Sequence, residues 1–300
     1  MLEHSRMQQG RDDGGDSGIQ GKDEEVLQYG HSTVDVFSAC KANLVRSPVP
    51  WMNGMELLED VLKNKRALPT GFDGIDTLLG GGLREGQLIE IVGPSSSGKT
   101  QFCLFVASYI ASNNFGSVVY MNTSNCFSPS RVSLIVNQLC SSLDKEDRQR
   151  RIREIMSRIH CLSIFDIFSL MDALDELKNT MREQKVNEDA KICILVVDAI
   201  SSLVTPILGS TNAQGRSLMV FTGYLLKRLA YELDISVLVT NHMVSGEGGM
   251  AKPAMGESWK PVPHIRLLIS RKPGSKICDI SLLRHTSMAC GGFAEFVIPD

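Results

Sequence analysis

The residues of this sequence best suited to chemistry lie between Gln87 and Gln101, which read QLIEIVGPSSSGKTQ. One apolar run ends at Gly93, and a second begins after Gln101. The spacing G-x-x-x-x-G-K-[ST] is typical of a phosphate-binding loop between a strand and a helix. Its glycines let backbone N–H groups turn toward phosphate oxygens, and the helix adds the positive end of its dipole. The sequence therefore predicts a site for a nucleoside triphosphate.

Two side chains of this loop have distinct expected roles. The Lys99 ammonium can reach the β- and γ-phosphates, and the Thr100 hydroxyl can ligate Mg²⁺. A chance match in a Gly/Ser-rich turn is the alternative, and the flanking apolar runs disfavour it. The predicted nucleotide-binding residues of the loop are Gly93, Pro94, Ser95, Ser96, Ser97, Gly98, Lys99, Thr100 and Gln101.

A carboxylate that could complete the site ends the most apolar run of the chain, residues 191–198, KICILVVD. A buried strand ending in Asp has the Walker-B form, which predicts that Asp198 holds Mg²⁺ directly or through water. An Asp that merely ends a strand is the alternative. With the phosphate loop upstream, we expect ATP and Mg²⁺ as the cofactors.

Alternating apolar strands and helices are expected to position these residues. They predict an α/β fold, a mostly parallel twisted sheet flanked by helices, with antiparallel strands added at the C-terminal end. The expected strands cover 88–92, 117–121, 159–164, 191–198, 235–240, 264–270, 276–283 and 293–298, and the main helices 128–143, 166–184 and 213–233.

Composition limits the class of protein. The net charge of −3 shows no overall basic character of the kind that favours nucleic-acid binding, so any DNA contact must be local. The eight cysteines form no C-x-x-C pair, which favours free thiols in a reducing compartment. The expected organisation is a disordered acidic, Gly-rich tail over 1–30, a short helical remnant of an N-terminal domain with its linker over 31–67, and an ATP-binding core over 68–300.

Four segments together resemble a known family: 70–101, 195–209 (LVVDAISSLVTPILG), 238–242 (LVTNH) and 252–270. They are similar to the eukaryotic branch of the RecA-type DNA recombinases, and within it to the plant-like D-type repair paralogues. The resemblance covers about residues 52–297 and implies a RecA-like P-loop ATPase core.

The resemblance also assigns roles outside the phosphate loop. It implies that Arg131 stacks on adenine and that His242 stands where the active recombinases have a γ-phosphate-sensing glutamine. The family's catalytic glutamate falls at Ser124. The surrounding YMNTSN, residues 120–125, holds no carboxylate, and its asparagines cannot accept a proton from water at neutral pH. We therefore predict slow or conditional ATP hydrolysis, with nucleotide acting mainly as a structural clasp.

Two loops of the family face DNA, and here they would be about 205–214 and 243–263. Lys252 and Lys260 are expected to contact phosphates, and Arg216 is a further candidate. Trp259 is a candidate stacking surface for a base, with the start of a buried segment as the alternative.

The reading favoured by these features is an ATP-binding recombinase paralogue. It would act in homologous recombination repair as a nuclear adaptor, binding other paralogues and single-stranded or branched DNA, with weak DNA-dependent ATPase activity. The region 283–292 lacks the Pro and Asp residues of the family's nucleotide cap, and 37–40 (FSAC) only weakly matches its F-x-x-A hook. The alternatives are a fully active DNA-stimulated ATPase that forms its own filament, and a P-loop small-molecule kinase.

Overall fold

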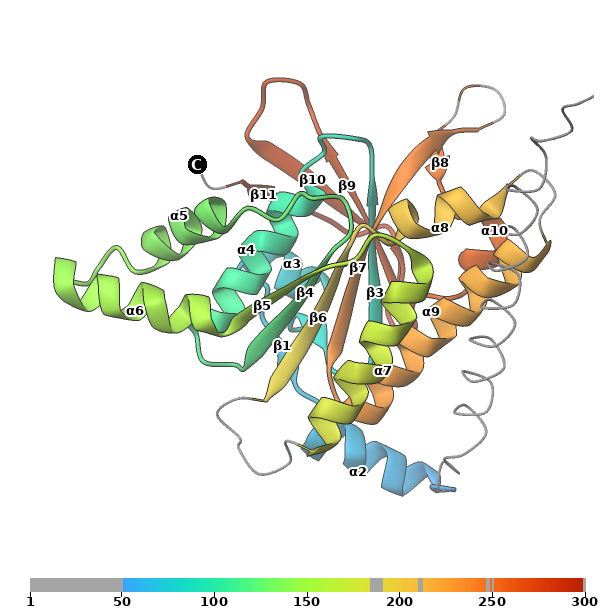
Figure 1. Ribbon diagram of the computed structural model, residues 1–300, viewed down its shortest axis with the longest axis horizontal. Coiled ribbons are helices and arrows are strands. Elements are labelled where there is room, and N and C mark those ends of the chain that lie inside the picture. The colour runs from blue at the N-terminus through green and yellow to red at the C-terminus, as the bar shows by residue number, and fades with distance from the viewer. Residues whose placement is uncertain (1–50, 184–190, 210–212, 247–248, 250, 299–300) are drawn as a thin grey trace, which may run out of the picture. The chain divides into compact units, whose positions relative to one another are not determined.

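One large sheet carries the candidate site in the computed structural model (Figure 1). The structure describes residues 51–183, 191–209, 213–246, 249 and 251–298. Within these residues the sheet has nine strands, in the order β11-β10-β9-β3-β7-β6-β4-β5, with β8 paired to β7. The tail expected over 1–30, and the remnant with its FSAC segment up to residue 50, lie outside the described residues.

The strands confirm the predicted fold class. β3, β4, β5, β6, β7 and β9 pair in parallel, whereas β8, β10 and β11 are added antiparallel. Their bounds are β3 Leu88–Gly93, β4 Ser117–Asn122, β5 Ile159–Ser163, β6 Ile192–Asp198, β7 Ser236–Ser245, β8 Ala251–Pro253, β9 Ile265–Arg271, β10 Ile277–Arg284 and β11 Phe293–Val297. A separate two-stranded sheet joins β1 (Ala67–Leu68) and β2 (Leu83–Arg84).

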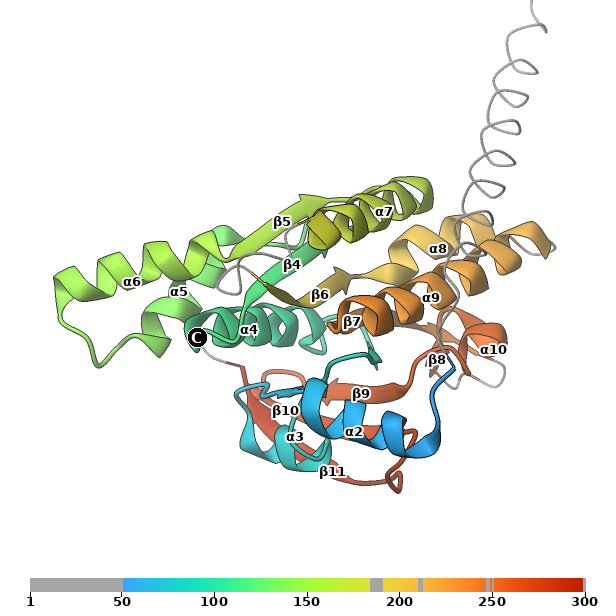
Figure 2. The same cartoon turned by 90° about the horizontal axis from the view of Figure 1, so that it is seen from below.

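Helices cover both faces of the large sheet (Figure 2). One face carries α4 (Lys99–Ser112), α5 (Pro129–Leu139) and α6 (Lys145–Ser157), and the other carries α7 (Ile167–Glu183) and α9 (Ala213–Leu233). β3, β4 and β6 are buried along their whole length because helices lie on both sides of them. The remaining described helices are α2 (Gly54–Asn64), α3 (Asp73–Leu78), α8 (Ile200–Leu208) and α10 (Gly256–Trp259).

Several sequence-based boundaries were wrong. The strand expected over 235–240 continues as β7 to Ser245, into the second DNA-facing loop expected over 243–263. The helix expected over 128–143 ends at Leu139, and a second helix begins at Lys145, where the Asp144 carboxylate accepts from the Glu146 and Asp147 amides. The first DNA-facing loop, expected over 205–214, is shorter because α8 continues through Pro206 to Leu208. No helix among the described residues is long and apolar enough to cross a membrane.

The parallel register brings the predicted site residues to one edge of the sheet. Gly93 pairs with His242 across β3 and β7, and Asn122 pairs with Asp198 across β4 and β6. The carboxyl ends of parallel strands form the usual ligand crevice of such sheets. These strands belong to one compact unit, Gly54–Asp300; the division predicted at residue 68 stays a prediction.

Candidate nucleotide-binding site

The phosphate loop lies where the sequence predicts it, between the end of β3 and the start of α4. Gly98 has φ +104°, a conformation that side chains rarely adopt, and a Cβ there would lie 2.8 Å from Ile298 Cδ1. A Cβ on Gly93 would lie 2.4 Å from the Ile269 carbonyl oxygen. Only glycine fits both positions, so the motif's glycines are required by the fold itself.

Lys99 is held inside the loop. Its ammonium donates to the Gly93 and Pro94 carbonyl oxygens at 2.8 and 2.7 Å, and the residue is only 6% exposed. Burial lowers the Lys99 pKa, and the nearby Asp198 carboxylate acts in the opposite direction. The buried Ser97 hydroxyl has no hydrogen-bond partner among the described residues. A cradle with a positive charge and an unsatisfied donor fits a phosphate group.

Asp198 lies at the end of β6, buried to 3% exposure. Its Oδ2 accepts from the Tyr120 hydroxyl at 2.8 Å, and its Oδ1 accepts from the Thr240 hydroxyl. Burial, and then the Asp198 charge, raises the Tyr120 pKa well above its ordinary value. The phenol therefore stays protonated and donates a hydrogen bond to the carboxylate. In the described part of the chain Asp198 forms no salt bridge.

A carboxylate held by neutral hydroxyls keeps its negative charge available for a cation. Oxygen ligands from Thr100 and Asp198, completed by phosphates and water, are the set that Mg²⁺ uses in such sites. The residues present therefore fit the metal, whose bound charge would offset that of the phosphates.

The end of β4 and the residues after it, 122–125, have the sequence NTSN and contain no acidic side chain. Ser124 is exposed, and its hydroxyl lies 2.9 Å from the Ser202 hydroxyl of α8. The side-chain oxygen Oδ1 of Asn122 already accepts from the Cys126 and Phe127 amides, at 3.0 and 3.4 Å. This stretch can hydrogen-bond water but cannot remove its proton.

Arg131 and His242 flank the loop from two sides. Arg131 lies in the first turn of α5, and its Nε donates to the Gln101 side-chain oxygen at 2.8 Å, next to the phosphate loop. The His242 amide donates to the Ser201 hydroxyl at 3.1 Å, and burial followed by the Lys99 charge lowers the pKa of its imidazole. The imidazole is therefore neutral at physiological pH and has one N–H to donate.

Of the four candidate DNA-contacting residues, three are exposed and one is buried. Arg216, on α9, is exposed, and so are Lys252 on β8 and Lys260 after α10. Trp259 is 0% exposed, and its indole N–H donates to Glu90 Oε1 at 2.8 Å. A fully buried indole offers no face to a base, so the burial corrects the expected stacking role; the alternative, the start of a buried segment, is what the structure shows.

A buried polar cluster on β3, which the sequence did not predict, is centred on Glu90. Glu90 of β3 is 0% exposed, and its carboxylate accepts from the side chains of Arg266, Asn241 and Trp259. The signal was a lone glutamate inside an apolar strand, because a buried carboxylate requires a partner. The cluster links β3, β7, β9 and α10.

Fold and site together define a RecA-like α/β domain with a phosphate loop. Residues 63–270 match the family model described as Rad51, and the chain belongs to this family. It is 35% identical over 224 residues to the DNA repair protein RAD51 homolog 4 of Bos taurus, covering 74% of this chain and 67% of that protein.

Two further relatives extend the comparison. The probable DNA repair protein RAD51 homolog 4 of Dictyostelium discoideum is 29% identical over 271 residues, covering 80% of this chain and 76% of that protein. The DNA repair and recombination protein RadB of Thermococcus sibiricus is 28% identical over 241 residues, which are 78% of this chain and 92% of that protein.

Proposed function

We propose that this chain is an ATP-binding adaptor in homologous recombination repair, which uses bound nucleotide as a structural clasp. The Rad51 family relationship supports a role in recombination repair. The adaptor role depends on one observation. A complete phosphate-binding loop lies at the same edge of the sheet as the end of β4, which has Ser124, and no carboxylate, where the resemblance puts the family's catalytic glutamate.

The clasp would work through the residues at the sheet edge. The loop amides and Lys99 would bind the phosphates, Thr100 and Asp198 would hold Mg²⁺, and Arg131 would cover the base. His242 would contact the γ-phosphate with its neutral imidazole. Because these residues come from β3, β6, β7, α4 and α5, nucleotide would hold separate elements of the domain together.

We propose that the partners are other recombinase paralogues and single-stranded or branched DNA, in the nucleus. Support comes from relatives named as DNA repair proteins and RAD51 homologues. A direct measurement is sedimentation velocity of the purified chain with ATP and single-stranded DNA, alone and after co-expression with such paralogues. A stable hetero-complex and no self-assembly are expected. Long homopolymers of this chain alone would contradict the adaptor role.

The missing base can be tested by restoring it. Ser124→Glu should raise ATP turnover several-fold while leaving nucleotide affinity within about threefold, because a carboxylate there could accept a proton from water. Ser124→Gln is the matched control, since it has similar size but no basic group. If both variants turn over ATP at the rate of the parent chain, Ser124 does not occupy the position of the base.

A further inference from the structure

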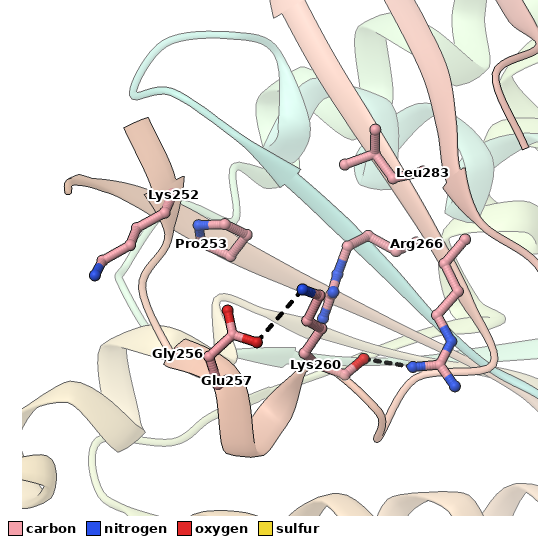
Figure 3. A pocket seen from close by; sticks show the side chains of 8 residues that line it. Lys252, Pro253, Gly256, Glu257, Lys260, Arg266 and Leu283 are labelled. Atoms are coloured by element: carbon pink, nitrogen blue, oxygen red, sulfur yellow. Dashed lines mark hydrogen bonds and ion pairs between the residues drawn. The ribbon is translucent and has the colours of Figure 1, made fainter. Parts of the chain in front are cut away.

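A hollow of about 420 Å³, lined by no residue of the phosphate loop, lies between β8, α10 and the strands β9 and β10 (Figure 3). Half of the residues that line it are cationic. We call it the basic hollow and define it by these cationic residues, Lys252, Lys260, Arg266 and Arg284. Pro253, Gly256, Glu257 and Leu283 complete its wall.

Arg266 is the buried member of this group. The residue is only 6% exposed, and its Nε donates to the Glu90 carboxylate behind it. The two terminal amino groups of its guanidinium have no hydrogen-bond partner among the described residues, and the side chain lines the hollow. A guanidinium has five N–H donors, so most of its capacity remains open toward the hollow. Neither terminal nitrogen is among the buried polar atoms that lack a partner, so both are open to the hollow, where an anion would be the strongest acceptor for them.

The other cationic groups gather around the same space. The Arg284 guanidinium donates to the Lys260 carbonyl oxygen at 2.5 Å, which holds the arginine at the wall. Lys260 Nζ lies 3.4 Å from Glu257, but that carboxylate is 89% exposed, and such exposed pairs contribute little. Counting Glu90 and Glu257 against the four cationic residues of the hollow leaves a net charge of +2.

Neighbouring titratable groups sense this positive charge. Burial and then Arg284 lower the pKa of Lys227, and burial followed by Lys227 and Arg284 lowers the pKa of His264 to about 4. Burial is the main cause of both shifts, and the Arg284 charge adds to each of them.

We propose that the basic hollow binds a phosphate group, with Arg266 as its buried anchor and Arg284 beside it. A guanidinium matches two oxygens of a phosphate at once, and the lysines add mobile positive charge at the rim. The phosphate belongs either to a nucleic-acid backbone or to a free anion such as a nucleotide. This inference deepens the proposed DNA contact and rests on it where the phosphate is that of DNA.

The test uses the full chain carrying Lys99→Ala, so that the phosphate loop does not contribute, and inorganic phosphate as the probe. Phosphate should raise the melting temperature, and adding Arg284→Ala should weaken the phosphate affinity about tenfold, since a charge-assisted contact is lost. Arg153→Ala, an exposed arginine of α6, is the matched control and should change nothing. Arg284→Ala is preferred to a change at Arg266, which would leave Glu90 buried without its charge partner.

A second arm identifies the source of the phosphate with a labelled single-stranded oligonucleotide and the otherwise unaltered chain. If DNA supplies it, Arg284→Ala should weaken binding and lower the slope of log affinity against log salt by about 1. A response to inorganic phosphate alone indicates a free anion. If Arg284→Ala changes the binding of neither probe, or if Arg153→Ala changes it equally, the basic hollow is not a phosphate site. Failure of the proposed function would show separately, as an absence of Lys99-dependent ATP binding.

Discussion

Two carboxylates lie buried in neighbouring parts of one sheet, and their surroundings differ in one respect. Asp198 accepts hydrogen bonds from two neutral hydroxyls and forms no salt bridge within the described residues. Glu90 instead accepts from a guanidinium, an indole and an amide. A buried carboxylate without a fixed cation can accept a metal ion, whereas one already paired with arginine serves the fold. The same side-chain chemistry therefore supports a binding role at β6 and a structural role at β3.

The largest effect should come from breaking the structural pair. Glu90→Gln removes the charge partner of Arg266 and should lower the free energy of unfolding by about 3–5 kcal/mol. Urea denaturation followed by circular dichroism measures it. Glu295→Gln, an exposed glutamate of β11, is the control and should stay within about 0.5 kcal/mol of the parent chain. A loss below about 1 kcal/mol for Glu90→Gln would mean that the pair has no structural role.

The next largest effect is a pH dependence of the free energy of unfolding, caused by His264, which contacts the strand that carries Glu90. His264 Nδ1 accepts from the Leu88 amide at 2.9 Å, and its pKa falls from 6.5 to about 4 on folding. Between these values the unfolded chain binds more protons, so the free energy of unfolding falls as the pH drops from 6.5 toward 4. The loss should reach about 1–3 kcal/mol, and His264→Gln should remove most of it. An unchanged pH profile in His264→Gln would assign the sensitivity elsewhere.

A smaller free-energy change is expected at Asp198, the carboxylate proposed to hold Mg²⁺. Asp198→Asn should lower Mg²⁺-dependent nucleotide affinity about tenfold, or roughly 1.4 kcal/mol, because an amide oxygen binds the cation more weakly. Titration of a fluorescent ATP analogue with and without Mg²⁺ measures it. The unfolding free energy should change much less than in Glu90→Gln. If Asp198→Asn instead lowers the stability and leaves nucleotide binding unchanged, Asp198 has the structural role assigned here to Glu90.

The smallest effect concerns the hydroxyl that orients Asp198. Tyr120→Phe removes one donor to the carboxylate and should cost about 1 kcal/mol of stability. Nucleotide affinity should stay within about threefold, since the Thr240 hydroxyl still holds the other oxygen. A loss of binding as large as that of Asp198→Asn would show that Tyr120 contacts the ligand directly.

The sequence predicted the parts of the site that are local. The phosphate loop is one contiguous motif, Asp198 ends one apolar strand, and the strand–helix alternation leaves few ways to order a parallel sheet. Each could be found because its residues are neighbours in the chain or repeat with the period of an element.

The parts that escaped prediction depend on distant partners. Glu90 and Arg266 lie 176 residues apart, and neither periodicity nor spacing connects them. Trp259 offered two alternatives because an aromatic residue beside a Gly-rich loop fits either a stacking surface or a core; only the burial of its side chain decides. The helix α8 runs through Pro206, since the packing of α8 against β7 and α9 outweighs the local preference of proline.

We propose above all that this chain binds ATP and hydrolyses it slowly. The most direct measurement is ATP binding and turnover by the purified chain, with and without single-stranded DNA, beside Lys99→Ala. We expect binding that depends on Lys99 and almost no turnover under either condition. Fast, DNA-stimulated turnover by the unaltered chain would show that another group acts as the general base. It would contradict the proposal that bound nucleotide serves mainly as a structural clasp.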